Sequence, residues 1–542
     1  MPDLEIPIGK RTPAYRFYEM LPAFLSYGSI ILLVALSLLN PLIAAAYLLA
    51  IIITTLIKAV GIAYHTTTGR NQLEKAQKVD WHDRLKQLEN PSKYIDDALK
   101  PDNDFAHDNH AGNLKEIIAH PNNYPKPSQI YNAVIIATYN ESYDILQPTI
   151  QSLVDSTYDK KHMIVVVAYE ARGGAAIKDT VHALEREFRG KFKDFLLVEH
   201  PNDLPNEVRG KGGNITYAGF FLKDWLDKRK IKYSDVIVTT LDADNRTHPT
   251  YFDYLTYEYV VHLDRKNLSY QPICLFINNI WDAPAPMRVV ATGNSFWNII
   301  SSMRPHTLRN FASHSQPMDA LVEMNFWSTR TIVEDGHQYW RSYFHFKGNY
   351  GVVSIFVPIY QDAVLSSTYL RTLKAQFIQL RRWAYGASDI AYVATRIFTD
   401  RREVPLGPSL ARLIRLIDGH VTLASIAILI AIGGWVPLFV NGQAAHSIAA
   451  HQLPEVISHI QQIALVGLFI TVFFAFKMLP PRPLRYKRHR NVWMILQWFL
   501  MPVTAIVYSS ASAFTSQTAL LLGRYFDKFD VTEKATVKSK SK

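Results

Sequence analysis

The stretch Val236–His248, VIVTTLDADNRTH, decides the fold of the central part of this chain. β-Branched and apolar residues run up to Leu241, and an acidic turn, Asp242-Ala243-Asp244, follows. This pattern predicts a buried strand whose carboxyl end opens into a loop. Open α/β sheets bind ligands at that end of their strands, and two carboxylates one residue apart suit a hard divalent cation beside phosphate groups. The triplet alone also fits an ordinary solvated turn, so the surrounding sequence has to decide.

Strand and helix patterns alternate on both sides of this stretch and predict one α/β domain over residues 131–362. Short buried strands that alternate with helices are typical of a mostly parallel sheet with both faces covered. Strands are expected at 133–138, 163–168, 195–198 and 236–241, and helices at 142–157, 175–189 and 216–229.

Long apolar segments flank this domain. Residues 21–57 contain no Asp, Glu, Lys or Arg, and one membrane span needs about 20 apolar residues. We therefore expect a transmembrane hairpin within residues 1–64 that turns at Asn40-Pro41. A C-terminal transmembrane region, 405–523, follows the domain, with spans near 418–440 and 456–476. Residues 492–523 fit one long span, a tight hairpin or a re-entrant segment. Their polar residues Gln497, Trp498, Tyr508 and Ser509–Ser512 suit either a channel lining or helix–helix contacts.

The remaining segments are polar or amphipathic. Residues 65–130 predict a polar linker with a short helix at 81–88 and a loop at 100–128, whose histidines (His107, His110 and His120) are expected in solvent. Residues 363–404 predict basic amphipathic helices at the membrane interface, with a surface helix of the soluble domain as the alternative. Residues 524–542 form a lysine-rich tail.

Charge and cysteine content limit the functional classes. The net charge of +11 allows a nucleic-acid binder, but the basic residues gather at the borders of the apolar segments, above all in PPRPLRYKRHR at 480–490. This placement indicates a membrane protein whose α/β domain is cytoplasmic, and no nucleic-acid partner is expected. The single cysteine, Cys274, excludes a disulfide framework within the chain.

Four more clusters carry candidate chemistry. Ala137–Glu141 (ATYNE) follows the first strand, where side chains can contact a nucleoside. Arg209–Asn214 (RGKGGN) offers glycines and a cation for phosphate, but it lacks the spacing of a Walker A loop. In Val333-Glu334-Asp335 a carboxylate can act as general base. Gln379–Trp383 (QLRRW) combines arginine, which pairs with diphosphate, and a flat aromatic face for a sugar.

In this order and between apolar runs, these clusters resemble the membrane-integrated family 2 glycosyltransferases, the group of cellulose, chitin and hyaluronan synthases. Phe529–Lys534 (FDVTEK) is similar to the gating-loop motif of the cellulose synthases. The resemblance implies an α/β GT-A-type nucleotide-sugar-binding domain, with a mostly parallel sheet, inserted between transmembrane α-helices. It implies inverting transfer of a sugar, with a uridine diphosphate sugar as the expected donor. The expected acceptor is a polysaccharide or a lipid-linked molecule, and the enzyme is expected to lie in the cell membrane.

The resemblance also assigns roles to residues of this chain. Asp335 is the expected general base, and Asp242 and Asp244 are the expected ligands of Mg²⁺ or Mn²⁺. The donor is expected to contact Thr138, Tyr139, Glu141, Glu170, Lys211, Asp242, Gln379, Arg382, Trp383, Thr532 and Lys534.

The chain departs from the family pattern at three places. Glu170 stands where the family has an aspartate after the second strand, and Val333 replaces the threonine of the base motif. His314–Pro317 stands where cellulose synthases have a cysteine-containing acceptor loop. Two alternatives therefore stay open: a transferase that adds single sugars to a lipid, and a non-catalytic membrane transporter or scaffold with a transferase-like domain.

Overall fold

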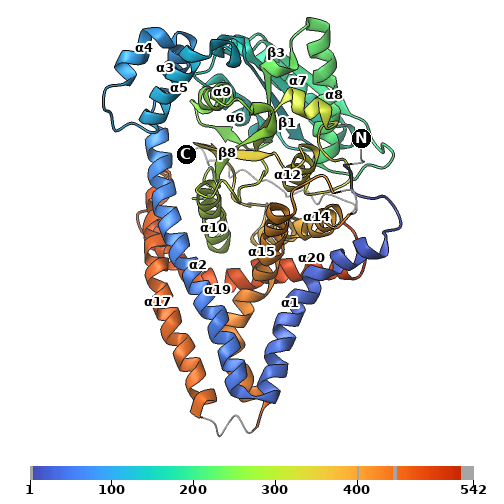
Figure 1. The fold of residues 1–542 in the computed structure, drawn as a ribbon, viewed down its shortest axis with the longest axis vertical. Helices are drawn as coiled ribbons and strands as arrows, with labels where there is room; N and C mark the ends of the chain where they lie inside the picture. Colours follow the sequence, from blue (N-terminus) through green and yellow to red (C-terminus); the bar gives the residue numbers. More distant parts are fainter. Residues whose placement is uncertain (1–3, 400–401, 443–447, 527–542) are drawn as a thin grey trace.

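The computed structural model describes residues 4–399, 402–442 and 448–526, and it has two parts (Figure 1). The upper part is built on a sheet, and the lower part consists of long helices that converge away from it. The predicted Thr532 and Lys534 lie outside the described residues.

An eight-stranded mixed sheet forms the upper part, in the order β3-β2-β1-β4-β7-β6-β8-β5. Strands β1 to β4 are parallel to one another, and β6 is parallel to β8. Strand β7 runs antiparallel to β4 and β6, and β5 runs antiparallel to β8. The mostly parallel sheet and its first four strands are confirmed, but β5 to β8 were not predicted. The strands are β1 (Tyr131–Thr138), β2 (Met163–Glu170), β3 (Asp194–His200), β4 (Val236–Asp242), β5 (Arg246–Thr247), β6 (Leu268–Leu275), β7 (His314–Pro317) and β8 (Gly351–Tyr360).

Helices cover both faces of this sheet. Alternate residues of β1 point to opposite faces, so Val134 and Ile136 join one hydrophobic core while Ala133 and Ile135 join another. The first core is completed by α6, α7 and α9, and the second by α8 and α11. The helices of this part are α6 (Tyr143–Val154), α7 (Gly174–Phe188), α8 (Lys211–Arg229), α9 (Tyr251–Val261), α10 (Ala285–Ser302), α11 (Met318–Glu323), α12 (Glu334–His345), α13 (Tyr369–Ala384) and α14 (Asp389–Ile397).

Residues 65–130 are not a linker, and the predicted loop at 100–128 is wrong. They contain α3 (Trp81–Glu89), α4 (Pro91–Ala98) and α5 (His107–Ala119), whose apolar side chains join the core beneath α9. His110 is buried, and its ring nitrogens lie 2.9 Å from the Tyr257 hydroxyl and 2.8 Å from Gln87 Oε1. The prediction of a solvent-exposed histidine was therefore wrong at this position.

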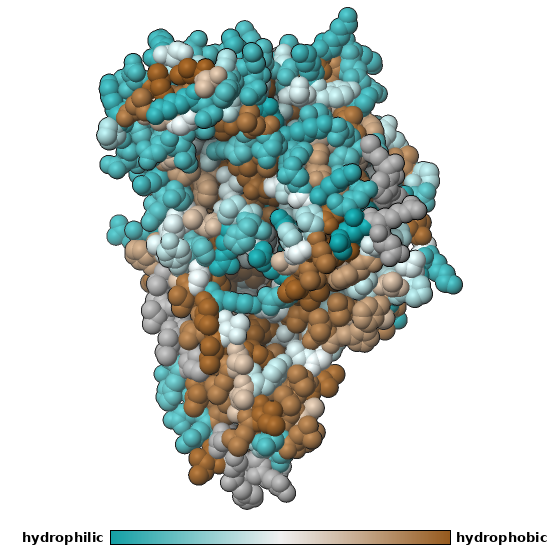
Figure 2. All heavy atoms as spheres, viewed as in Figure 1, coloured by the Kyte–Doolittle hydropathy of each residue, from teal (hydrophilic) through white to brown (hydrophobic). Residues whose placement is uncertain are grey.

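The lower part starts with α1 (Pro13–Leu39) and α2 (Pro41–Ala76), and the turn predicted between them, at Asn40, is confirmed. It also contains the long helices α15 (Leu406–Ile432) and α17 (Ile448–Met478) and the short helix α16 (Val436–Val440). Among the described residues, four helical segments are long and apolar enough to cross a membrane: Pro13–Leu39, Pro41–Ala76, Leu406–Val440 and Arg490–Leu521. Figure 2 shows that apolar side chains dominate the surface of the lower part and polar ones that of the upper part.

Residues 490–521 form one continuous helical stretch, which excludes the tight hairpin. It comprises α18 (Arg490–Leu496), α19 (Met501–Thr504) and α20 (Ala511–Leu521), joined by a 3-10 turn and a π-helical turn. In Figure 1 this stretch crosses beneath the sheet instead of running along α2 and α17. The polar residues weighed as a channel lining are packed: Gln497, Tyr508, Ser510 and Ser512 are all buried.

The first helix and the last one are fastened together. The Arg16 guanidinium donates to Leu520 O at 2.8 Å and to Leu521 O at 2.9 Å, and so satisfies carbonyls at the end of α20. Glu19, which is only 2% exposed, pairs with Arg16 at 2.7 Å and accepts a hydrogen bond from the Tyr525 hydroxyl at 2.8 Å. Residues far apart in the sequence thereby form one ionic cluster beside the sheet domain.

Candidate active site

The acidic turn lies where the sequence predicted it, at the carboxyl end of β4. Asp242 is the last residue of this strand and is in register with Ala137 of β1. The side chain of Lys211, at the start of α8, reaches across so that its Nζ lies 2.6 Å from Asp242 Oδ1 and 2.9 Å from Ala312 O. Burial opposes the charged ammonium, but Asp242 and Glu334 outweigh it and raise the pKa of Lys211.

Asp335 lies in the first turn of α12, and its carboxylate accepts a hydrogen bond from Gly336 N at 2.7 Å. Burial raises its pKa, and Asp242 adds to that rise, whereas Lys211 and Arg382 lower it. The charges of Asp242, Lys211 and Arg382 therefore all influence the predicted base. Burial and the adjacent Asp335 also raise the pKa of Glu334.

Asp244 faces the end of β8. Its Oδ2 accepts a hydrogen bond from Asp362 N at 3.4 Å, and Asn278 donates to its backbone oxygen at 3.1 Å. Asp362 was missed by the sequence analysis, because the strand that leads to it was not predicted. The position of an acid two residues after β8, at the same edge of the sheet, was the signal that could have revealed it.

The loop after β1 is held by its own glutamate. Glu141 Oε2 accepts hydrogen bonds from Thr138 Oγ1 at 2.7 Å and from Tyr139 N at 2.8 Å. Glu141 thus shapes the turn between β1 and α6, next to the end of β2. There, Glu170 is buried and forms an ion pair with Arg172, a residue that the sequence analysis did not select.

The glycines after Lys211 serve packing. A Cβ on Gly212 would clash with the backbone oxygen of Ser328, and one on Gly213 would clash with the Glu207 carboxylate. The expectation that these glycines open the backbone to a ligand has no support here, since their free faces are occupied by protein atoms. Small residues are needed because α8 packs tightly against these two loops.

Helix α13 carries the three remaining predicted donor contacts. Gln379 accepts a hydrogen bond from Gln376 at 3.0 Å. The positive charge of Arg382 lowers the pKa of Asp335. The ring centroid of Trp383 lies 6.1 Å from that of Phe276. The Trp383 side chain stays 38% exposed, as a ring that stacks on a ligand requires. The Ser516 hydroxyl donates to Arg381 O at 2.5 Å and ties this helix to α20. The site therefore adjoins the lower, apolar part.

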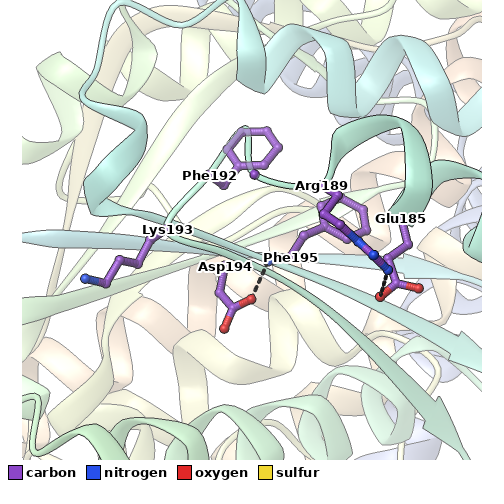
Figure 3. A pocket seen from close by; sticks show the side chains of 7 residues that line it. Glu185, Arg189, Phe192, Lys193, Asp194 and Phe195 are labelled. Carbon is purple, nitrogen blue, oxygen red and sulfur yellow. Dashed lines mark hydrogen bonds and ion pairs between the residues drawn. The ribbon is translucent and has the colours of Figure 1, made fainter.

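A surface pocket away from this edge offers no comparable chemistry. It surrounds the beginning of edge strand β3 (Figure 3), at the amino end of the sheet. Three of its charged side chains are engaged: Arg189 pairs with Glu185 at 4.0 Å, and Asp194 accepts from Trp225 Nε1 at 3.0 Å. The carboxyl edge, with Lys211, Asp242 and Asp335, is therefore the candidate active site.

Comparisons with known proteins identify no family for this chain. No family model matches the sequence, and no curated protein matches it. A mannosyltransferase from Pyrobaculum calidifontis, solved with GDP-Man and Mn²⁺, is similar in structure with 13% identity and a TM-score of 0.40, over 86% of this chain and 100% of that chain. TarS 1-349 of S. aureus with UDP-GlcNAc has 11% identity and a TM-score of 0.35, over 73% and 93% of the two chains. GalNAc-T7 with UDP, GalNAc and Mn²⁺ has 11% identity and a TM-score of 0.30, over 53% and 55%.

Proposed function

We propose that this protein is a membrane-bound inverting glycosyltransferase with a GT-A-type domain. Its donor is a nucleoside diphosphate sugar, and a uridine diphosphate sugar is the first candidate. The observation that carries the proposal is the electrostatic cluster of Lys211, Asp242, Asp335 and Arg382 at the carboxyl edge of the sheet. A partly buried carboxylate that experiences the charges of two cations suits a reaction in which a proton leaves a hydroxyl while negative charge develops on a diphosphate.

Asp335 removes the proton from the acceptor hydroxyl while its oxygen attacks the anomeric carbon. The bond from that carbon to the diphosphate breaks on the opposite face, which inverts the configuration. Arg382 pairs with the leaving diphosphate in the bidentate manner of a guanidinium, and Lys211 keeps Asp242 in place. Trp383 stacks on the acceptor sugar, and Gln379 hydrogen-bonds it.

The acidic residues fit a hard divalent cation. Among the described residues, no cluster of three His, Cys, Asp or Glu side chains forms a complete metal site. Mg²⁺ in particular is commonly held by one or two carboxylates, with substrate phosphates and water completing its shell. Asp242 and Asp244 would hold Mg²⁺ or Mn²⁺ in this way. When bound, the cation would neutralise charge on the diphosphate.

The acceptor is a polysaccharide or a lipid-linked molecule that reaches the site from the membrane. The hydrogen bond from Ser516 of α20 to Arg381 O of α13 keeps the site beside the lower part, and thus at the membrane surface. Thr532 and Lys534 of the tail complete the donor site in this proposal. The side chains of Gln497, Tyr508 and Ser510 are buried, so none of them lines an open path for a polymer. This favours the second candidate function, transfer to a lipid-linked acceptor.

A donor screen on the detergent-purified full-length protein tests the proposal. We would supply each common nucleoside diphosphate sugar with Mg²⁺ or Mn²⁺ and native membrane lipid, and follow nucleoside diphosphate release and product size. Release with one donor should vanish on chelation and fall by about 10²–10⁴-fold in Asp335→Asn, because one general base supplies that factor. The matched control is Asp179→Asn, an amide substitution on the exterior helix α7.

Binding of the donor should survive in Asp335→Asn, since the nucleotide does not depend on the base. Turnover at the normal rate in Asp335→Asn would contradict the assignment of the base. If no donor bound and none released its nucleotide, the scaffold or transporter function would replace the transferase.

A further inference from the structure

The loop between α17 and α18 carries an excess of positive charge. This basic loop, residues 482–490 (RPLRYKRHR), contains five Arg or Lys residues and no Asp or Glu. Among the described residues, Arg485 forms an ion pair with a carboxylate, but no ion pair engages Arg482, Lys487 or Arg488. Lys487 and Arg488 are also exposed. Three charges of the loop are therefore available to a ligand from outside the chain.

The basic loop is nevertheless fixed to the sheet domain. Arg485 Nη2 donates to both carboxylate oxygens of Asp282, at 2.6 and 2.7 Å. At the end of the loop, Arg490 Nη2 donates to Trp281 O at 3.0 Å. Just before the loop, Pro480 O accepts a hydrogen bond from Trp281 Nε1 at 3.0 Å. Both ends of the loop are thus tied to the same two residues, and the loop has an ordered support.

This support belongs to a segment that also contacts the candidate active site. In the segment 278–282, the side chains of Asn278 and Asn279 donate to the backbone oxygens of Asp244 at 3.1 Å and of Ala363 at 2.9 Å. The helical stretch that follows the basic loop is apolar enough to cross a membrane. The basic loop therefore lies where the sheet domain meets the apolar lower part.

Large apolar side chains are exposed beside the cations. Leu484, within the loop, is fully exposed, and Trp493 and Phe499 are 58% and 82% exposed. Between them, Met494 and Trp498 are buried in the cores next to α10. One face of this stretch thus packs on the protein while the other carries apolar side chains outward. Tryptophan and leucine next to Lys and Arg are typical of the border between lipid headgroups and acyl chains.

We propose that the basic loop binds the headgroups of anionic phospholipids. Arg482, Lys487 and Arg488 meet the phosphodiester with charge-assisted hydrogen bonds, while Leu484 and Trp493 lie among the lipid chains. Charge selects the lipid, because a zwitterionic headgroup carries a cation of its own that opposes the three of the loop. A nucleic acid would satisfy these charges but leave the exposed apolar side chains in water, so a membrane surface is the favoured partner.

The test measures which lipid gathers at the basic loop of the full-length protein in phosphatidylcholine nanodiscs. Leu484→Cys gives a single position for a fluorophore, because Cys274 is buried. We would quench this fluorophore with phosphatidylglycerol or phosphatidylcholine that carries a spin label near the glycerol. Each Lys or Arg near an anionic surface contributes about 5-fold to binding. We therefore expect half-quenching at a fraction of phosphatidylglycerol at least about 10-fold lower than that of phosphatidylcholine, and a smaller difference at high salt.

Charge variants in the Leu484→Cys background separate the headgroup contact from general membrane contact. Replacing Arg482, Lys487 and Arg488 together by Gln should reduce the preference to within about 2-fold, because the three cations are lost. Arg482→Lys with Arg488→Lys keeps the charges and should keep the preference. If the triple variant did not fold, the comparison of the two lipids and of the two salt concentrations would still decide, because it uses the native loop charges.

The matched control loses three cations on the sheet domain. Replacing Arg186, Lys191 and Lys228 by Gln removes the same charge from exposed positions of α7, the loop that follows it and α8, and should keep the preference. Inorganic phosphate and a short single-stranded DNA, each compared with chloride at matched ionic strength, should not abolish the preference.

Four results would overturn the inference. They are equal quenching by the two lipids, a preference that persists in the triple Gln variant of the loop, displacement of the anionic lipid by inorganic phosphate, and its displacement by the DNA. The last two would indicate a site for free phosphate and a nucleic-acid surface, respectively. None of these results bears on the proposed function, since no sugar donor takes part in the measurement.

Discussion

Asp335 is surrounded by charges of both signs, and they set the pH at which it can accept a proton. Burial raises its pKa from the ordinary aspartate value, so the residue is protonated, and inactive as a base, to a higher pH than an exposed aspartate. We expect turnover at saturating donor to fall as the pH is lowered through this raised pKa. A plot of turnover against pH from about 4 to 9 locates the acidic limb.

Two substitutions should move this limb in opposite directions. Asp242→Asn removes a negative charge that raises the pKa of Asp335, so the limb shifts to lower pH. Lys211→Met removes a positive charge that lowers it, so the limb shifts to higher pH. Both variants will lose rate, but the position of the limb is independent of its height. Shifts of the same sign would show that another group controls the limb.

At this scale the sequence identified residues by their place in a motif, but it did not predict which neighbour each charged side chain would contact. Asp242 could be selected because an acidic turn after an apolar run marks a strand end, and Asp335 because its motif resembles the base motif of the family 2 glycosyltransferases. Glu170 was expected to face the nucleotide, yet Arg172, only two residues later, occupies its carboxylate. Whether a charged side chain points to a ligand or to its neighbour depends on the backbone turn between them, and a residue pattern does not define that turn.

Helix α12 presents the proposed base, and one buried pair fixes this helix to α14. His337 Nδ1 lies 2.7 Å from Asp389 Oδ1, with side-chain exposures of 0% and 5%. Asp389→Ala leaves the imidazole without its partner, and an unsatisfied buried polar group costs about 1–3 kcal/mol. We therefore expect a lower melting temperature in detergent, measured by intrinsic fluorescence.

The control for this prediction is Asp97→Ala. That residue pairs with Lys100 on the surface, where both side chains are about three-quarters exposed, and its removal should leave the melting temperature unchanged. An Asp389→Ala protein that melts like wild type would mean that the pair does not hold α12 to α14.

Elements with a strong apolar pattern were predictable, and those that mix polar residues into the core were not. The runs in β1, β2 and β4 are continuous and apolar. By contrast, β6 (LSYQPICL) contains a serine, a glutamine and a proline although every residue is buried, and β7 (HSQP) is short and polar. Gln271 explains part of this difference, since its side chain bonds to Ser313 O at 2.9 Å and to Phe311 N at 2.8 Å. Such pairing permits polar residues inside but removes the pattern that predicts a strand.

On the scale of the whole molecule, the lower part has an apolar surface and the upper part a polar one, so we expect the long helices to cross a membrane and the sheet domain to lie on one side of it. In Figure 1 the turn between α1 and α2 lies at the end farthest from the sheet. The basic loop at 482–490 connects α17 to α18. We expect Leu39→Cys, at a 79% exposed position of that turn, to react with a membrane-impermeant maleimide from one side of sealed vesicles. Lys487→Cys and Lys191→Cys should react only from the other side.

The wild-type protein is the control for this labelling, because Cys274 is buried and should not react. Labelling of Leu39→Cys and Lys191→Cys from the same side would contradict the transmembrane arrangement of α1 and α2. The sequence predicted these two helices from their lack of charge. It did not predict that α2 continues to Ala76 and joins the sheet domain. The last turns of α2 are polar, and they are stabilised by contacts with residues that are distant in the sequence.

The ionic cluster of Arg16, Glu19 and Tyr525 also sets an order of events during biosynthesis. Glu19 leaves the ribosome early, but the tyrosine that completes its hydrogen bonding follows 506 residues later. At the usual 5–20 residues per second this delay is roughly 25–100 s. For all that time α1 lacks its last partner, so the closing of this contact is a late checkpoint that chains truncated before Tyr525 never pass.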